Sequence, residues 1–174
     1  MSGQGFLSRI ALGAAGMRRL FNLWPPFRGM GIRVRELSPD FTHAVVELRM
    51  KLLNRNYVGT HFGGSLFAMA DPWFMILMMK RLGDDYVVWD KAGSVRFIKP
   101  ARGTVTARFE MPEERVAQAR ELTSDGKKYE PVFKAAIVDA QGVTVAEVEK
   151  TLHIRRKTGS PTEPAPERLH RGRG

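Results

Sequence analysis

The segment at residues 56–73, NYVGTHFGGSLFAMADPW, combines a glycine pair with a carboxylate inside an otherwise apolar run. Gly63 and Gly64 open the run, and Asp71 follows Gly64 by seven residues. If the run is a helix, its first N–H groups have no partner within the helix and can stabilise a developing oxyanion. Asp71 would lie about two turns along on the same side, where a carboxylate can act as a general base or a nucleophile. The spacing therefore predicts a hydrolytic site beside the start of a helix.

Asp71 also has a structural interpretation, because Pro72 follows it. An Asp–Pro pair is typical of a helix start, with the aspartate as N-cap and the proline in the first helical position. In a continuous helix, Pro72 would instead remove one backbone hydrogen bond and crowd the carbonyl of Ala68, which bends the helix. These residues leave both interpretations open, and only the second frees the carboxylate for chemistry.

The apolar run must belong to an enclosed element. Residues 65–83 are apolar on nearly every face of a helix and end in Lys80, Arg81 and Gly83, which is typical of a helix C-terminus. A helix that is apolar all round has to be buried. We therefore expect one central helix that the rest of the chain surrounds.

The rest of the chain reads mainly as strands. Period-two alternation or apolar runs bounded by turn residues predict strands in residues 31–37, 41–50, 86–100, 103–110, 127–140 and 143–156. A polar helix is expected in residues 111–126. Because βαβ alternation is absent, we predict an α+β fold in which one curled antiparallel sheet wraps around the central apolar helix.

The two ends are expected to lie outside this domain. An amphipathic helix is predicted from Phe6 to Trp24, within a helical segment at residues 1–27, and it precedes the domain at residues 28–156. This helix is expected to pack on the body, with contact at a membrane surface as the alternative. Residues 157–174 are expected to form a disordered basic tail.

Composition limits the classes of function. The 174 residues include no cysteine and four scattered histidines, so we expect no disulfide, thiolate nucleophile or metal site. The net charge of +10 would attract polyanions, but the sequence contains no nucleic-acid-binding motif, so no nucleic-acid partner is expected. The start lacks a secretory pattern, and the longest apolar stretch falls short of the roughly 20 residues of a membrane span. We therefore expect a cytoplasmic protein.

The passage NRNYVGTHFGGSLFAMAD, together with the order of elements, resembles the hotdog-fold acyl-CoA thioesterases over about residues 20–156, as an uncharacterised branch of that superfamily. In better-known branches an asparagine precedes the glycine pair and a carboxylate lies two turns beyond it. Asn56, Gly63–Gly64 and Asp71 occupy these positions. Those branches commonly carry histidine directly before the glycines, whereas this sequence has Phe62 there and His61 one place earlier.

The resemblance implies hydrolysis of an acyl-CoA or related thioester, with coenzyme A present only as part of the substrate. It also implies a homodimer, or a dimer of dimers, whose pocket combines the helix of one subunit with strands of its neighbour. Catalytic roles are then expected for Asp71, Asn56 and Gly64. Substrate contacts are expected from His61, Phe62, Gly63, Ser65, Lys91, Arg96, Lys99 and Arg102.

The four cations among these residues could bind the phosphates of coenzyme A through charge-assisted hydrogen bonds. Lys91 also has the simpler interpretation of a solvated lysine on a strand. Two other functions remain open. One is an acyl-CoA or lipid-binding protein without turnover, and the other is a hotdog dehydratase that uses His61 and Asp71.

Overall fold

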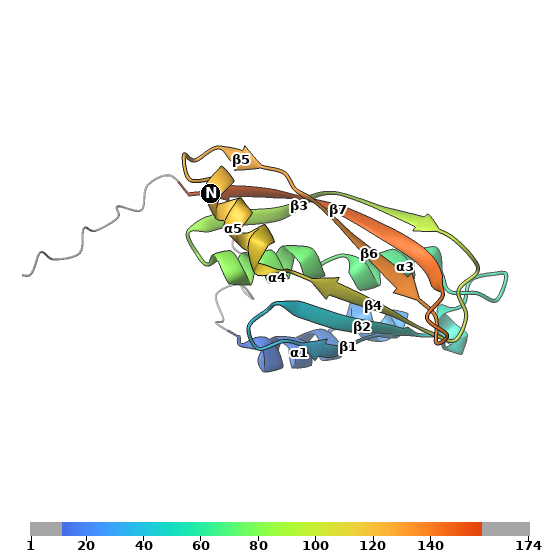
Figure 1. Ribbon diagram of the computed structural model, residues 1–174. Helices are drawn as coiled ribbons and strands as arrows, with labels where there is room; N and C mark the ends of the chain where they lie inside the picture. Colours follow the sequence, from blue (N-terminus) through green and yellow to red (C-terminus); the bar gives the residue numbers. More distant parts are fainter. Residues whose placement is uncertain (1–11, 158–174) are drawn as a thin grey trace, which may run out of the picture.

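The computed structural model describes residues 12–157, and an antiparallel sheet of seven strands dominates this part of the chain (Figure 1). The strands are β1 (Ile32–Leu37), β2 (His43–Arg49), β3 (Tyr86–Phe97), β4 (Thr104–Glu110), β5 (Lys128–Tyr129), β6 (Val132–Val138) and β7 (Thr144–Arg156). Their order in the sheet is β1-β2-β4-β6-β7-β3, and the short β5 pairs with β7. β1 with β2 and β6 with β7 form antiparallel hairpins, and Gln141 and Gly142 lie in the turn of the second hairpin.

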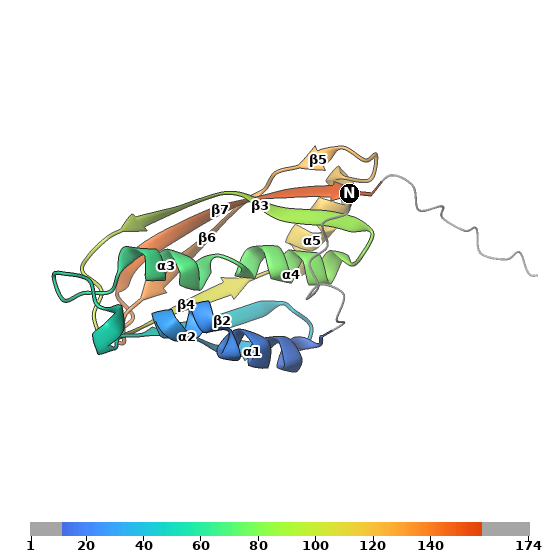
Figure 2. The same ribbon diagram turned by 180° about the vertical axis from the view of Figure 1, so that it is seen from behind.

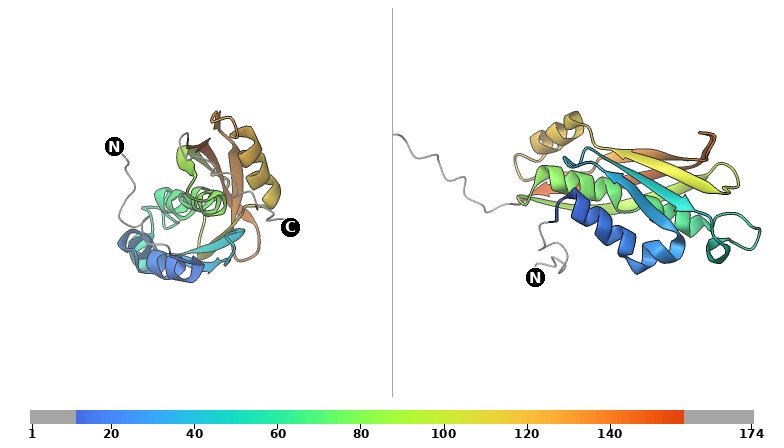
Figure 3. Two further views of the ribbon diagram at one scale, coloured as in Figure 1. Left: turned by 90° about the vertical axis from the view of Figure 1, so that its left-hand side faces the viewer. Right: turned by 90° about the horizontal axis from the view of Figure 1, so that it is seen from below.

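The helices of the described residues are α1 (Ala14–Leu23), α2 (Pro25–Met30), α3 (Gly63–Ala70), α4 (Trp73–Leu82) and α5 (Glu113–Leu122), with a short 3-10 turn at Leu52–Asn54. The sheet curls around α3 and α4, as the views from behind and along the helices show (Figures 2 and 3). The α+β fold predicted from the sequence is therefore confirmed. None of these helices is long and apolar enough to cross a membrane.

The core fills the space between the concave face of the sheet and the central helices. Alternate residues of β4, namely Val105, Ala107 and Phe109, are at most 1% exposed, as the period-two pattern predicted. From the helices, Trp73 and Phe74 pack against Phe109, and both are almost completely buried. Burial of the apolar side chains of both layers holds the helices inside the sheet.

The central helix is not continuous, which corrects the expectation of one helix. α3 ends at Ala70 and α4 begins at Trp73, with Asp71 and Pro72 between them. The Asp71 N–H reaches back to the Ala68 carbonyl at 3.4 Å, and regular hydrogen bonds resume from Ile76 to Pro72 at 2.9 Å. Pro72 has no N–H to donate, so the break falls where proline removes a hydrogen bond.

The interpretation of Asp71 as the N-cap of the following helix is wrong. No side chain donates to or accepts from the first turn of α4 as a cap, and the residue before that helix is Pro72. The backbone of Asp71 is itself helical, at φ −54° and ψ −54°. Its carboxylate is therefore free to face another partner.

The N-terminal helix packs on the body, as expected, and ends before the sequence WPPF. The expected start of this helix at Phe6 lies outside the described residues, as does the expected tail at residues 157–174 apart from Lys157. Pro25 does not simply end the helical region, because it occupies the first position of a second short helix, α2, which the sequence analysis did not predict. Proline suits that position because its missing N–H would have no partner there.

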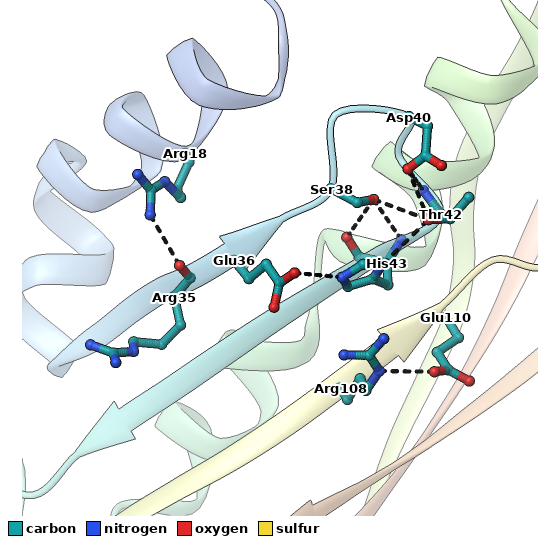
Figure 4. A network of polar contacts seen from close by, with 9 residues as sticks. All are labelled: Arg18, Arg35, Glu36, Ser38, Asp40, Thr42, His43, Arg108 and Glu110. Atoms are coloured by element: carbon teal, nitrogen blue, oxygen red, sulfur yellow. Dashed lines mark hydrogen bonds and ion pairs between the residues drawn. The ribbon is translucent and has the colours of Figure 1, made fainter.

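α1 closes one edge of the sheet. The Asn22 side chain donates to the Val34 carbonyl at 3.0 Å and accepts from the Val34 N–H at 2.8 Å, as a neighbouring strand would. Arg18 donates to the Arg35 carbonyl at 3.1 Å (Figure 4). β3 lies at the opposite edge and, within the described part of the chain, pairs with β7 alone. The sheet therefore has one covered edge and one open edge.

The turn between β1 and β2 is held by polar side chains (Figure 4). The Ser38 hydroxyl donates to the His43 carbonyl and accepts from the His43 N–H, and Asp40 accepts hydrogen bonds from Thr42. The Thr42 hydroxyl lowers the pKa of the Asp40 carboxyl. His43 also contacts Glu36 at 2.8 Å across the hairpin. This network fixes the register of the β1–β2 hairpin. It lies on β1, β2 and their turn and includes no residue of α3.

Replacing Asn22 with Ala should lower the free energy of unfolding by about 1–2 kcal/mol, because two partly buried hydrogen bonds to Val34 are lost together. Urea unfolding followed by circular dichroism measures this change. A Gln141→Ala variant, in an exposed turn, is the control and should match the wild type. Equal stability of the Asn22 variant would show that water replaces its contacts without cost.

Candidate active site

The loop before α3 is organised by Asn56. Its Oδ1 accepts hydrogen bonds from the N–H groups of Val58 and Thr60 at 3.1 and 2.9 Å. Its Nδ2 donates to the Thr60 hydroxyl at 2.8 Å and to the His61 carbonyl at 3.2 Å. These four bonds use the donors and acceptors of the amide. The structure thus places Asn56 as the residue that fixes how the chain enters α3.

His61 is a buried support for the same loop. Its N–H donates to the Ala101 carbonyl at 3.0 Å, and its Nε2 lies 2.8 Å from the Gly103 carbonyl. Because a carbonyl only accepts, Nε2 carries the proton, and the buried Nδ1 has no partner among the described residues. Burial lowers the pKa of His61, so the ring stays neutral. The structure does not bring His61 into contact with Asp71, as the dehydratase interpretation would require.

The two glycines leave space for neighbouring aromatic rings. A Cβ atom on Gly63 would lie 2.7 Å from the ring of Phe97, and one on Gly64 would lie 2.4 Å from the ring of Phe62. Phe62 and Phe97 are both more than half exposed. The start of α3 therefore lies beside two accessible apolar rings, one from its own N-cap and one from the end of β3.

The backbone donors at this helix start differ from the expectation in one respect. The Ser65 N–H donates to the Phe62 carbonyl at 2.9 Å and Ser65 is buried, so this amide is not among the first N–H groups expected to lack a partner within the helix. The N–H groups of Gly63 and Gly64 donate to no residue within 12–157, and Gly64 is exposed. The Gly64 amide is thus a donor that an incoming oxyanion can use.

Asp71 lies on the same exposed side of the helix as Gly64. The two residues are exposed, whereas Leu66, Met69 and Ala70 between them are buried. The Asp71 side chain is 54% exposed, and its Oδ1 accepts a hydrogen bond from Lys150 Nζ at 2.7 Å. Its Oδ2 accepts none from the described residues. One carboxylate oxygen is therefore anchored and the other is available.

Lys150 is a site residue that the sequence analysis missed. It lies on β7 opposite Gly93 of β3, and its side chain is only 3% exposed. The ammonium lies between two carboxylates, at 2.7 Å from Asp71 and 3.2 Å from Asp90, and above the ring of Phe67. A signal was present in the sequence, because Lys150 falls between the buried Val148 and Leu152 in the alternation of β7.

Gly93 leaves space for the side chain of Lys150. A Cβ atom there would lie 2.9 Å from the Phe67 ring and 3.0 Å from Cδ of Lys150. Asp90 faces the same interior, and its buried Oδ1 makes an ion pair with Lys150 that lacks hydrogen-bond geometry. Burial raises the pKa of the Asp90 carboxyl, and the nearby Lys150 opposes that rise. In this site two carboxylates, Asp71 and Asp90, thus contact one buried cation, Lys150.

The sequence and the fold match known proteins as follows. Residues 13–154 match the model of a family described as a domain of unknown function, DUF4442. The chain belongs to the DUF4442 family. No curated protein matches the sequence.

Several solved structures resemble this DUF4442 protein. One, from Pseudomonas aeruginosa, is called a protein of unknown function and probable thioesterase; it is 23% identical, with a TM-score of 0.73 over 84% of this chain and 97% of that one. A thioesterase from Haemophilus influenzae is 13% identical, with a TM-score of 0.61 over 85% and 94% of the two chains. A putative thioesterase from Shewanella oneidensis is 15% identical, with a TM-score of 0.58 over 82% and 96%. These similarities show the hotdog fold that the sequence predicted.

The four expected phosphate contacts of this DUF4442 protein are not gathered around Asp71. Lys91 pairs with Glu130 at 2.6 Å, Arg96 with Glu147 at 2.5 Å and Lys99 with Asp139 at 3.0 Å. Arg96 alternates along β3 with Val95 and Phe97, so it lies on the other face of the sheet from the helix.

Arg102 is placed differently from the other three cations. It donates to the Gly59 carbonyl at 3.1 Å and so lies beside the loop that leads into α3. Among the described residues of this DUF4442 protein, no three histidine or acidic side chains gather as a metal site. The chemistry of the site therefore depends on the Gly64 amide and the Asp71 carboxylate.

Replacing Asp90 with Asn should stabilise the protein at pH 7.5, because the native pKa of Asp90 is raised and its ionised form is therefore disfavoured by folding. The penalty is present above the native pKa and disappears as the carboxyl becomes protonated on acidification. The advantage of the variant should shrink as the pH falls toward 4, and urea unfolding at both pH values measures it. A variant less stable than the wild type at pH 7.5 would mean that pairing with Lys150 outweighs burial.

Proposed function

We propose that the protein hydrolyses acyl thioesters of the coenzyme A type. The observation that carries this proposal is the exposed side of α3, where the Gly64 amide and one oxygen of the Asp71 carboxylate have no hydrogen-bond partner among residues 12–157. The similarity in fold to proteins named as thioesterases supports the reaction class. Binding the thioester carbonyl and activating its attacker are the two functions that such a pair of groups can perform.

In the proposed reaction, the carbonyl oxygen of the thioester accepts a hydrogen bond from the Gly64 N–H. Asp71 Oδ2 takes a proton from a water molecule, whose oxygen attacks the carbonyl carbon. The carbon–sulfur bond then breaks, and the thiolate leaves with the proton that Asp71 returns. A direct attack by Asp71 would form an anhydride that water hydrolyses in a second step. Lys150 is a positioning residue here, because its ammonium donates a hydrogen bond to Oδ1 and so fixes the direction of the carboxylate.

The site is proposed to form between two copies of the chain. Gly64 and Asp71 are separated by about 10 Å along the helix axis, since each residue adds about 1.5 Å. A carbonyl carbon within about 3.5 Å of Asp71 is therefore too far from the Gly64 amide of the same chain. Pairing of two open β3 edges would add a second sheet and place the Gly64 of one chain near the Asp71 of the other. A homodimer, or a dimer of dimers, follows from this arrangement.

The surroundings support an apolar acyl group. The rings of Phe62 and Phe97 flank the glycine pair and are 56% and 55% exposed, and Phe67 lies beside Gly93. Burial of an acyl chain against these rings would supply binding free energy. Arg102 is the expected cation that lies next to the loop before α3, so we propose it for the phosphates of coenzyme A.

A binding protein without turnover is the second candidate. The observation that favours it is the Lys150–Asp71 ion pair, because the ammonium at 2.7 Å already engages one oxygen of the carboxylate that would have to activate the attacker. In that case the same exposed rings and amides would hold the acyl thioester intact.

Replacing Asp71 with Asn should reduce kcat by at least about 100-fold, because the general base is lost while the side chain keeps its shape. Release of free thiol from a panel of acyl-CoAs measures turnover, and calorimetry measures binding of the same ligands. A Glu149→Gln variant on the neighbouring outward position of β7 is the control. Tight binding without thiol release by the wild type would select the binding protein, and unchanged turnover in the Asp71 variant would exclude the proposed base.

A site shared between subunits predicts complementation. Gly64→Pro removes the proposed donor at a position in the first helical turn that tolerates proline, and should lower kcat by about 100-fold or more. Gly64→Ala keeps the N–H and is the control for the added side chain. When the Gly64→Pro and Asp71→Asn variants are refolded together, about half of the dimers should contain one chain of each kind. Each mixed dimer has one intact site of two, so about a quarter of all sites should be active. No recovery from two folded variants would contradict sharing.

A further inference from the structure

A basic surface lies where α1 and α2 meet β1 and the end of β2. Two neighbouring hollows form it, and they are lined by Arg18, Arg19, Asn22, Leu23, Arg28, Gly29, Gly31, Ile32, Arg33, Val34, Arg35, Arg49 and Lys51. Seven of these residues are arginine or lysine, and none is acidic. We call this set of residues the basic surface.

Few carboxylates balance this charge. Glu47 pairs with Arg35 at 3.1 Å and with Arg49 at 3.0 Å. The other basic residues of the surface, which are Arg18, Arg19, Arg28, Arg33 and Lys51, make no ion pair with any carboxylate of residues 12–157. Elsewhere on the sheet, exposed cations such as Lys91 and Arg96 are paired with acidic neighbours. The basic surface therefore carries an excess of positive charge that attracts an anionic partner.

Exposed apolar side chains border the same surface. Leu23 is 66% exposed and Trp24 is 43% exposed, at the junction of α1 and α2. The side of α1 that faces the body is already used, because Met17 and Phe21 pack against the core. Leu23 and Trp24 thus add apolar area that the fold itself does not bury.

We propose that the basic surface docks the protein on anionic lipid bilayers. Arginines next to an exposed leucine and tryptophan match the interface of a membrane, where cations meet lipid phosphates and apolar rings enter the headgroup layer. A nucleic acid would use the cations but would gain nothing from Leu23. This surface is separate from Asp71 and Lys150, so the inference does not rest on thioester hydrolysis.

Flotation of the full chain with vesicles tests the inference. Binding should be strong to vesicles of phosphatidylcholine with 30% phosphatidylglycerol, weak to phosphatidylcholine alone, and reduced by 0.5 M NaCl. Arg28→Gln with Arg33→Gln should weaken binding by about 10-fold or more. The matched control, Lys127→Gln with Lys128→Gln, removes the same charge at β5, which lies on the opposite side of the molecule from α1 (Figure 1).

Leu23→Ser separates a membrane from other polyanions. It should reduce vesicle binding severalfold and leave binding to a DNA oligonucleotide unchanged. The inference is overturned if the vesicles do not bind, if binding is equal without anionic lipid, or if both double variants lose the same affinity. It is also overturned if Leu23→Ser has no effect on vesicles, because the cations alone would then explain the binding. Every variant should retain the wild-type circular dichroism spectrum, since none of these side chains is buried.

Discussion

The Lys150 ammonium, buried between Asp71 and Asp90, connects the central helix to the sheet. An isolated ammonium would be costly to bury, so Lys150 can occupy this position only with carboxylates beside it. Asp71 comes from the break between α3 and α4, whereas Asp90 comes from β3. The ion pairs therefore join three segments that are distant in sequence, and they fix the direction in which Asp71 points. The remaining features of the candidate site are arranged around that fixed carboxylate.

The break at Pro72 and the glycine pair complete this arrangement. Because Pro72 interrupts the hydrogen bonds of the central helix, Asp71 lies at a helix end rather than in a regular turn. At the other end of α3, Gly63 and Gly64 admit the rings of Phe97 and Phe62 and leave amides exposed. An apolar helix thus presents polar groups at its two ends, while Leu66, Met69 and Ala70 between them are buried.

The two edges of the sheet differ in a way that matters for assembly. Asn22 and Arg18 satisfy backbone groups of β1, so that edge is not available to another strand. β3 has twelve residues and pairs on one side only. The open edge lies beside Gly93 and Phe97, and therefore beside the candidate site. Because α1 covers the β1 edge, a second copy of the chain can pair with the sheet at the β3 edge, which lies beside the proposed site.

The sequence by itself determined the strands, the enclosed helix and the positions of Gly64 and Asp71, because alternation, apolar runs and turn residues are local signals. It also contained the resemblance to hotdog-fold proteins, whose fold the solved structures share. Only the tertiary structure decided that Lys150 pairs with Asp71, that Asn56 and His61 hold the loop, and that Arg96 lies on the far face of the sheet. Those outcomes depend on strand register and on contacts between residues as many as 79 positions apart, which no local pattern encodes.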